Sequence, residues 1–119
     1  MTQGQCHCGN IRLSIPYLTE TGTSCNCSIC ARYGAVWGGF TESEVEVTVG
    51  AHGLATYCHG DRMINFHHCP NCGCITHYSS TSPGPDARLA INYRLFEASD
   101  WKGVKVRLFD GANSWEYID

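Results

Sequence analysis

The chain has 119 residues, 43% of them hydrophobic and 16% charged, an ordinary balance for one small globular domain. Its formal net charge of −3, with few and scattered basic residues, argues against a nucleic-acid surface. No apolar run is long enough to cross a membrane, and the first residues lack the basic and apolar parts of a signal peptide. We therefore expect a single domain over residues 1–119, in the cytoplasm, with neither nucleic acid nor membrane as a partner.

Short strands separated by turns make up most of the predicted secondary structure. Apolar and polar residues alternate in segments 11–15 and 45–49, which stop at Pro16 and Gly50. Further strands are expected at 54–57, 64–68, 75–79, 88–92 and 104–109. Helical turns are expected at 28–33 and 95–100, and the composition of 79–86 predicts a loop. Many short strands at regular spacing predict an all-β domain whose modest core needs metal cross-links.

Nine cysteines are the most informative feature of the composition. Their odd number and the expected reducing compartment argue against disulfides. Eight of them form three tight local groups: Cys6 with Cys8, Cys25 with Cys27 and Cys30, and Cys69 with Cys72 and Cys74. Thiols gathered in this way indicate a shared cation, with buried free thiols as the simpler alternative.

Two of these groups contain pairs with ligand spacing. Cys69 and Cys72 stand at positions i and i+3 of a turn, where two thiolates can hold one tetrahedral zinc. A redox dithiol would instead open a helix after a strand, in a context that this chain lacks. Cys6 and Cys8 can also share one ion if the chain bends locally, which Gly9 would permit. We call these the C-x-x-C pair and the N-terminal pair.

The central group places three thiols, Cys25, Cys27 and Cys30, within six residues, and we call it the triplet. Three ligands from one segment fill three corners of a tetrahedron and leave the fourth open, as in catalytic zinc sites. A fourth protein ligand from elsewhere in the chain would close the site.

Spacing leaves two ways of pairing these groups. In one, the N-terminal pair shares an ion with Cys27 and Cys30, and a second site holds Cys58, Cys69, Cys72 and Cys74. In the other, the N-terminal pair shares an ion with the C-x-x-C pair, and the triplet stands alone. The second closes a longer loop, at an entropic cost that grows only logarithmically with length.

Taken in this order, the motifs resemble those of the glutathione-dependent formaldehyde-activating enzyme family, which shares its domain with the centromere protein V type. The resemblance runs over nearly the whole chain. It is carried by Gly4-x-Cys6-x-Cys8-Gly9, by Cys25-Asn26-Cys27-Ser28-x-Cys30 with Arg32 and Gly34-Ala35, by Cys69-x-x-Cys72-Gly73, and by Asn92 and Trp115.

The resemblance implies a tent-like (Mss4-like) all-β fold of small, zinc-stapled antiparallel sheets with short helical turns. It implies two zinc ions per chain: a structural one on Cys6, Cys8, Cys69 and Cys72, and a catalytic one on Cys25, Cys27 and Cys30. Enzymes of this family are carbon–sulfur lyases that add glutathione to formaldehyde, which forms S-hydroxymethylglutathione.

Three functional hypotheses follow. In the first, an open zinc site holds the thiolate of glutathione or another small thiol beside an aldehyde. Arg32 would then bind the anionic substrate, or else hydrogen-bond to nearby carbonyl groups in a structural role. The second hypothesis is a non-enzymatic zinc module that binds a protein. The third is a redox or thiol-repair enzyme that uses Cys58 or Cys74, which are otherwise expected to be free thiols.

Overall fold

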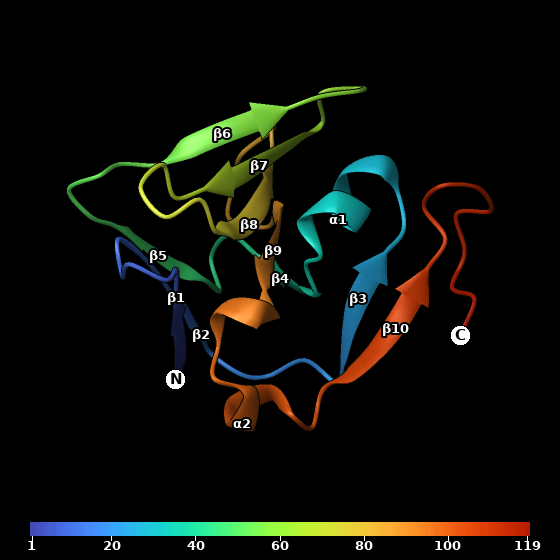
Figure 1. Cartoon of the computed structure of the whole chain (residues 1–119), viewed down its shortest axis with the longest axis horizontal. Helices are drawn as coiled ribbons and strands as arrows, with labels where there is room; N and C mark the ends of the chain where they lie inside the picture. Colours follow the sequence, from blue (N-terminus) through green and yellow to red (C-terminus); the bar gives the residue numbers. More distant parts are fainter.

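The structure is a computed structural model that describes residues 1–119 and forms two β-sheets with short helical segments between strands (Figure 1). The smaller sheet has the order β1-β2-β5 and consists of β1 (Thr2–Gln5), β2 (Ile11–Ile15) and β5 (Glu46–Val49). The larger sheet has the order β10-β3-β4-β9-β8-β7-β6. Its strands are β3 (Thr21–Cys25), β4 (Trp37–Thr41), β6 (Ala55–Cys58), β7 (Ile64–His68), β8 (Ile75–Ser80), β9 (Arg88–Asn92) and β10 (Lys105–Phe109).

The helical segments are short. They are α1 (Ser28–Tyr33), the 3-10 turn η1 (Tyr93–Leu95) and α2 (Ala98–Trp101). Neither α-helix has the length and apolar character that a membrane crossing requires.

The all-β prediction is confirmed, and the seven predicted strands are present with ends that shift by at most one residue. The helix predicted at 95–100 is wrong in its extent, because the chain is extended at Phe96 and forms η1 before it and α2 after it. The Phe96 side chain is buried in the main core, and this packing separates the two turns.

Strands β1, β3 and β4 escaped prediction because each contains a buried glycine that interrupts the apolar alternation. A Cβ atom at Gly4, Gly22 or Gly38 would lie within 2.8 Å of a buried side chain. Those positions therefore need glycine for packing, although glycine is a poor strand former. The sequence pattern reads such strands as loops.

The expectation of antiparallel sheets is wrong at one edge, where β10 pairs with β3 in parallel. The register runs from Lys105 opposite Thr21 to Phe109 opposite Cys25. Most of the chain separates these two strands, so no hairpin turn forces them to be antiparallel. The pairing places the C-terminal segment beside the triplet (Figure 1).

The larger sheet separates two apolar cores. On one face, Phe40, Leu89 and Ile91 belong to the main core, which the smaller sheet also covers. On the other face, Trp37 and Ala90 belong to a second cluster that includes Cys30 of the triplet. Because side chains alternate along a strand, neighbouring residues of β4 and β9 serve different cores.

Two adjacent glycines of β4 provide a test of this two-faced sheet. A Cβ at Gly38 would lie 2.5 Å from the ring of Tyr93, which is fully buried and hydrogen-bonded to Thr19 at 2.7 Å. A Cβ at Gly39 would have no neighbour within 4 Å. We expect Gly38→Ala to lower the free energy of unfolding of the metal-loaded protein by about 1–3 kcal/mol, measured in urea. Gly39→Ala should change it by less than about 0.5 kcal/mol. Equal losses would contradict the assignment of the two faces.

Candidate metal centres

The turn after β1 and the turn after β7 bring four cysteines together. Their sulfur atoms all lie within 4.8 Å of one another, and they belong to Cys6, Cys8, Cys69 and Cys72. We call this group the four-cysteine cluster. The Cys6–Cys8 and Cys8–Cys69 sulfur distances are 3.8 and 3.6 Å. A tetrahedral zinc with Zn–S bonds of about 2.3 Å requires sulfur separations of about 3.8 Å, so the cluster has the dimensions of a zinc site.

Both turns depend on a glycine with positive φ. Gly9 has φ 79° and Gly73 has φ 81°, a region that other residues adopt at a steric cost. Gly9 N donates to the carbonyl of Cys6 at 2.9 Å, and Gly73 N donates to the carbonyl of Cys69 at 2.8 Å. The bend expected at Gly9 is present, and in each turn the positive-φ glycine donates back to the first cysteine, over three residues at Gly9 and over four at Gly73.

Hydrogen-bond donors surround the sulfurs of the four-cysteine cluster. The amide of Ile11 donates to Cys6 Sγ at 3.2 Å, and Asn10 Nδ2 donates to Cys69 Sγ at 3.4 Å. Burial raises the pKa of Cys6 to about 11. Burial also opposes ionisation of Cys72, but hydrogen bonds from the backbone of Cys74 and Cys8 outweigh it and lower the pKa of Cys72 to about 5. Four thiolates this close together need a compensating cation, which is the role a divalent metal fills.

The triplet spans the junction of β3 and α1. Cys25 ends β3, Cys27 is the N-cap of α1, and Cys30 lies inside the helix. Their sulfurs also lie within 4.8 Å of one another, and no fourth metal-binding side chain joins the group. The amide of Cys27 donates to Cys25 Sγ at 3.5 Å, and that of Cys30 donates to Cys27 Sγ at 3.4 Å. The donor set and spacing fit three corners of a tetrahedral zinc site.

The thiols of the triplet have unequal environments. Burial raises the pKa of Cys30 to about 12, and the neighbouring Trp37 indole acts in the opposite direction. Burial also opposes ionisation of Cys27, but hydrogen bonds from Cys30 outweigh it and lower the pKa of Cys27. A Cβ at Gly111 would lie 2.6 Å from Cys25 Sγ, so the C-terminal segment packs closely over this end of the triplet.

A cavity of about 860 Å³ opens beside the triplet. All three of its cysteines line the cavity together with aromatic side chains from β4, β7, β8 and the C-terminal segment: Trp37, Phe66, Tyr78, Phe109, Trp115 and Tyr117. Its floor is one row across the sheet, in which Phe66 pairs with Tyr78, Tyr78 with Ala90, and Ala90 with Gly39. The small residues Gly39 and Ala90 leave the space open above the sheet.

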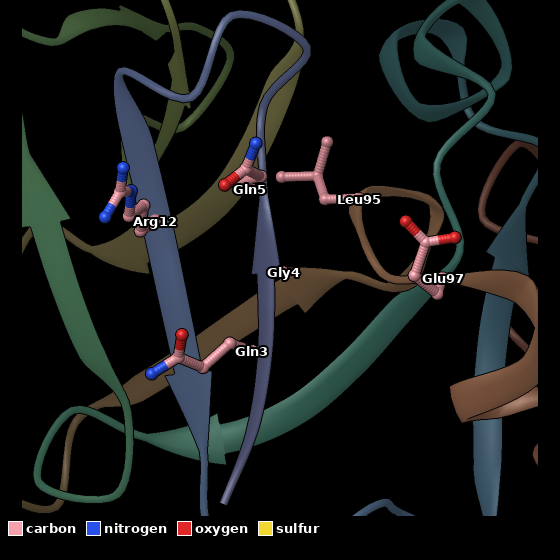
Figure 2. A pocket seen from close by; sticks show the side chains of 6 residues that line it. All are labelled: Gln3, Gly4, Gln5, Arg12, Leu95 and Glu97. Carbon is pink, nitrogen blue, oxygen red and sulfur yellow. The ribbon is translucent and has the colours of Figure 1, made fainter.

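A second, smaller cavity of about 250 Å³ lies over β1 and β2 (Figure 2). Its lining is mostly polar and consists of Gln3, Gly4, Gln5, Arg12, Leu95 and Glu97. It contains no cysteine or histidine, whereas the larger cavity is lined by all three cysteines of the triplet and by His59.

The structure brings together the thiol groups of the second pairing considered above. The N-terminal pair lies with the C-x-x-C pair, and the triplet stands alone. Cys58 and Cys74 belong to neither group. That these groups hold zinc, and that the triplet is catalytic, remain predictions.

Arg32, which the sequence suggests as a substrate-binding residue, lies outside the cavity lining. Its guanidinium donates to the carbonyl of Ser28 at 2.7 Å instead.

Arg88 and His59 line the cavity, and neither was singled out from the sequence. His67 and His77 stack on one another at 4.4 Å, with His77 facing away from the cavity, and no histidine joins either thiol group. The register of β9 with β4 brings Arg88 to the cavity, and the sequence pattern does not define this register.

Comparison with known proteins identifies a family and a similar solved structure. The family model described as glutathione-dependent formaldehyde-activating enzyme matches residues 1–105. A solved structure of a Rhodobacter sphaeroides protein is similar, with 28% identity, coverage of 87% of this chain and 98% of that chain, and a TM-score of 0.71. A search among curated proteins finds no match. The range matched by the family contains both thiol groups and ends before Phe109.

Two cysteine substitutions test whether the four-cysteine cluster stabilises the fold while the triplet serves the reaction. Cys69 is fully buried in the four-cysteine cluster, which joins two distant turns. Because a structural zinc contributes on the order of 10 kcal/mol to the free energy of folding, Cys69→Ser should unfold the domain. Cys27→Ser should retain the fold and release about half of the bound zinc. The measurement is metal content together with circular dichroism.

Cys58→Ser is the matched control, since Cys58 belongs to neither thiol group. It should keep both the fold and the full zinc content. If Cys27→Ser and Cys69→Ser lose structure equally, the two groups do not have separate roles.

Proposed function

The chain belongs to the glutathione-dependent formaldehyde-activating enzyme family, and on that premise we propose that it is a carbon–sulfur lyase that joins a small thiol to an aldehyde at the triplet. Glutathione and formaldehyde are the reactants that the family name suggests. The cavity is large enough for reactants of this size and for larger ones.

One observation carries the proposal: the triplet has three ligands and opens into the cavity. A structural zinc site is normally closed by a fourth protein ligand, and catalytic sites keep that position for substrate or water. A protein-interaction module has no need for a cavity of this size beside an incomplete metal site. The cavity therefore favours small-molecule chemistry over the alternative of a binding module.

The proposed chemistry is an addition without oxidation or reduction. Zinc bound to the three thiolates would supply a fourth position that favours the thiolate form of an incoming thiol. In the reaction, the thiol sulfur forms a bond to the carbonyl carbon, and the π electrons of the carbonyl group move to its oxygen. The proton that leaves the thiol ends on that oxygen, so the hydroxyl adduct contains all atoms of both reactants.

The side chains of the cavity would orient the reactants and carry the proton. Phe66 and Trp37 form an apolar wall beside the triplet, which excludes water from the reacting atoms. Burial raises the pKa of Tyr78, so its hydroxyl remains a hydrogen-bond donor at neutral pH. Tyr78 and His59 both line the cavity, and either can deliver a proton to the oxygen of the adduct.

Titration of glutathione into the cobalt-loaded protein tests the proposal. Cobalt replaces zinc in thiolate sites and makes thiol coordination visible as a change in charge-transfer absorption. We expect a saturable change, and we expect added formaldehyde to be consumed together with the thiol. A protein that holds two metal ions but shows no spectral response to any small thiol would exclude the proposed reaction.

Gly39 offers a matched pair of variants for the same experiment. Gly39→Leu places a side chain over the open floor of the cavity and should weaken thiol binding at least about tenfold. Gly39→Ala adds only a methyl group and should bind the thiol much as the original chain does. If both variants bind the thiol equally well, the thiol binds elsewhere.

A further inference from the structure

The cavity contains one strongly basic side chain. Arg88 is the only lysine or arginine that lines it. Arg88 begins β9 and lies two residues before Ala90, which puts both side chains on the cavity face of the sheet. Its Cζ atom lies 5.9 Å from the centre of the Tyr78 ring. The guanidinium is therefore held at the cavity wall by an aromatic face.

Arg88 has no anionic partner within the chain. The single ion pair of the structure joins Arg107 to Asp119, and no carboxylate accepts a hydrogen bond from Arg88. Asp61 is the only carboxylate of the cavity lining, and it accepts from the amide of Met63 at 3.1 Å in a turn. An arginine that is unpaired beside an aromatic ring is suited to bind a planar anion such as a carboxylate.

Contacts between neighbouring side chains define the path from the triplet to Arg88. Cys30 and Trp37 pack in the same buried cluster, and the Trp37 and Tyr78 ring centres are 4.9 Å apart. Arg88 follows on the other side of Tyr78. A ligand with its sulfur at the triplet and its anionic group at Arg88 must extend over both rings.

We propose that Arg88 anchors a carboxylate of the thiol that reacts at the triplet. The substrate is then a thiol with a carboxylate separated from its sulfur by an extended linker. This inference rests on the proposed function, and it gives Arg88 the role that the sequence suggested for Arg32.

Two thiols of equal length, mercaptohexanoate and mercaptohexanol, separate the contribution of the carboxylate to binding from that of the rest of the ligand. Binding is followed by the charge-transfer absorption of the cobalt-loaded protein. The original chain should bind mercaptohexanoate roughly tenfold more tightly than mercaptohexanol. Arg88→Gln should abolish this preference and leave the affinity for mercaptohexanol unchanged.

Arg12→Gln is the matched control, because Arg12 lies at the smaller cavity, and it should retain the preference. Arg32→Gln tests the competing position, and loss of the preference in that variant alone would overturn the assignment to Arg88. A preference that survives in Arg88→Gln, or equal binding of both thiols to the original chain, would also overturn it. If neither thiol changes the spectrum, the proposed function fails and this inference fails with it.

A second observation, independent of substrate, concerns the indole nitrogen of Trp37. Its Nε1 atom is the only buried side-chain nitrogen or oxygen in the structure without a hydrogen-bond partner. Trp37 is 5% exposed, so water does not satisfy this donor. Buried donors of this kind are rare, because leaving one unpaired costs the free energy of its desolvation.

The triplet contains a matching acceptor. Cys25 Sγ and Cys27 Sγ each accept a backbone amide, at 3.5 and 3.4 Å, whereas no backbone amide donates to the sulfur of Cys30. Cys30 and Trp37 pack together in the second cluster. We infer that Trp37 Nε1–H donates to the thiolate of Cys30 when the triplet holds its metal ion. Trp37 is thus a positioning residue that orients one ligand and offsets its charge.

Trp37→Phe keeps an aromatic ring in the cluster and removes the donor. We expect the triplet of this variant to lose its metal to a chelator at a roughly tenfold lower chelator concentration, while the four-cysteine cluster keeps its ion. Trp101→Phe is the matched control, since Trp101 stacks on Tyr93 beside the main core, and it should behave as the original chain does.

Nuclear magnetic resonance supplies a readout that does not depend on stability. The indole proton of Trp37 should move downfield when the triplet is loaded with metal, and that of Trp101 should stay in place. An unmoved Trp37 resonance, unchanged metal retention in Trp37→Phe, or a triplet that takes up no metal would each overturn the inference.

Discussion

The contact between the turn after β1 and the turn after β7 is the constraint on which the rest of the molecule depends. It brings together sulfurs that are up to 66 positions apart in the chain, from Cys6 to Cys72, and it fastens the smaller sheet to the larger one. Cys6 and Cys69 are fully buried and belong to the main core, so the thiols also form part of the apolar packing. With a metal ion bound, the cluster would act as a cross-link between the two sheets.

Because that cross-link belongs to one face of the larger sheet, the other face is free for a cavity. The main core packs large side chains around Tyr93 and the smaller sheet, and it leaves no room for a methyl group at Gly38. On the opposite face, Gly39 and Ala90 leave the floor of the cavity uncovered, with Trp37 and Tyr78 beside it. Core packing and the cavity lining thus use alternate residues of the same strands, so a change at one position affects mainly one of them.

Features that depend on residues close together in the sequence could be predicted, and features that depend on contacts between distant segments could not. Local signals were sufficient for strands with alternating residues such as 11–15, and for the thiol groups, whose spacing is a property of adjacent residues. Spacing left open whether Cys6 and Cys69 belong to the same cluster, and only the family resemblance implied that they do. Strand β4 was missed because Gly38 serves a distant ring, and Arg88 was missed because only the pairing of β9 with β4 and β8 brings it to the cavity.

The C-terminal segment bears on the proposed reaction because it lines the cavity from outside the range that the family model matches. The triplet lies within the range that the family shares, whereas Phe109, Trp115 and Tyr117 line the cavity from beyond residue 105. Asn26, which stands between two cysteines of the triplet, holds this segment: its amide nitrogen donates to Asp110 Oδ1 at 3.0 Å, and its oxygen accepts from the backbone of Ala112 at 3.0 Å.

The aromatic wall of the cavity is thereby hydrogen-bonded to the loop that carries the triplet. Under the proposed function, a change in this segment, which lies outside the residues matched by the family model, would alter the cavity wall and leave the triplet in place. In this chain the segment contributes the aromatic side chains of Phe109, Trp115 and Tyr117, which would give the proposed thiol substrate an apolar wall to pack against.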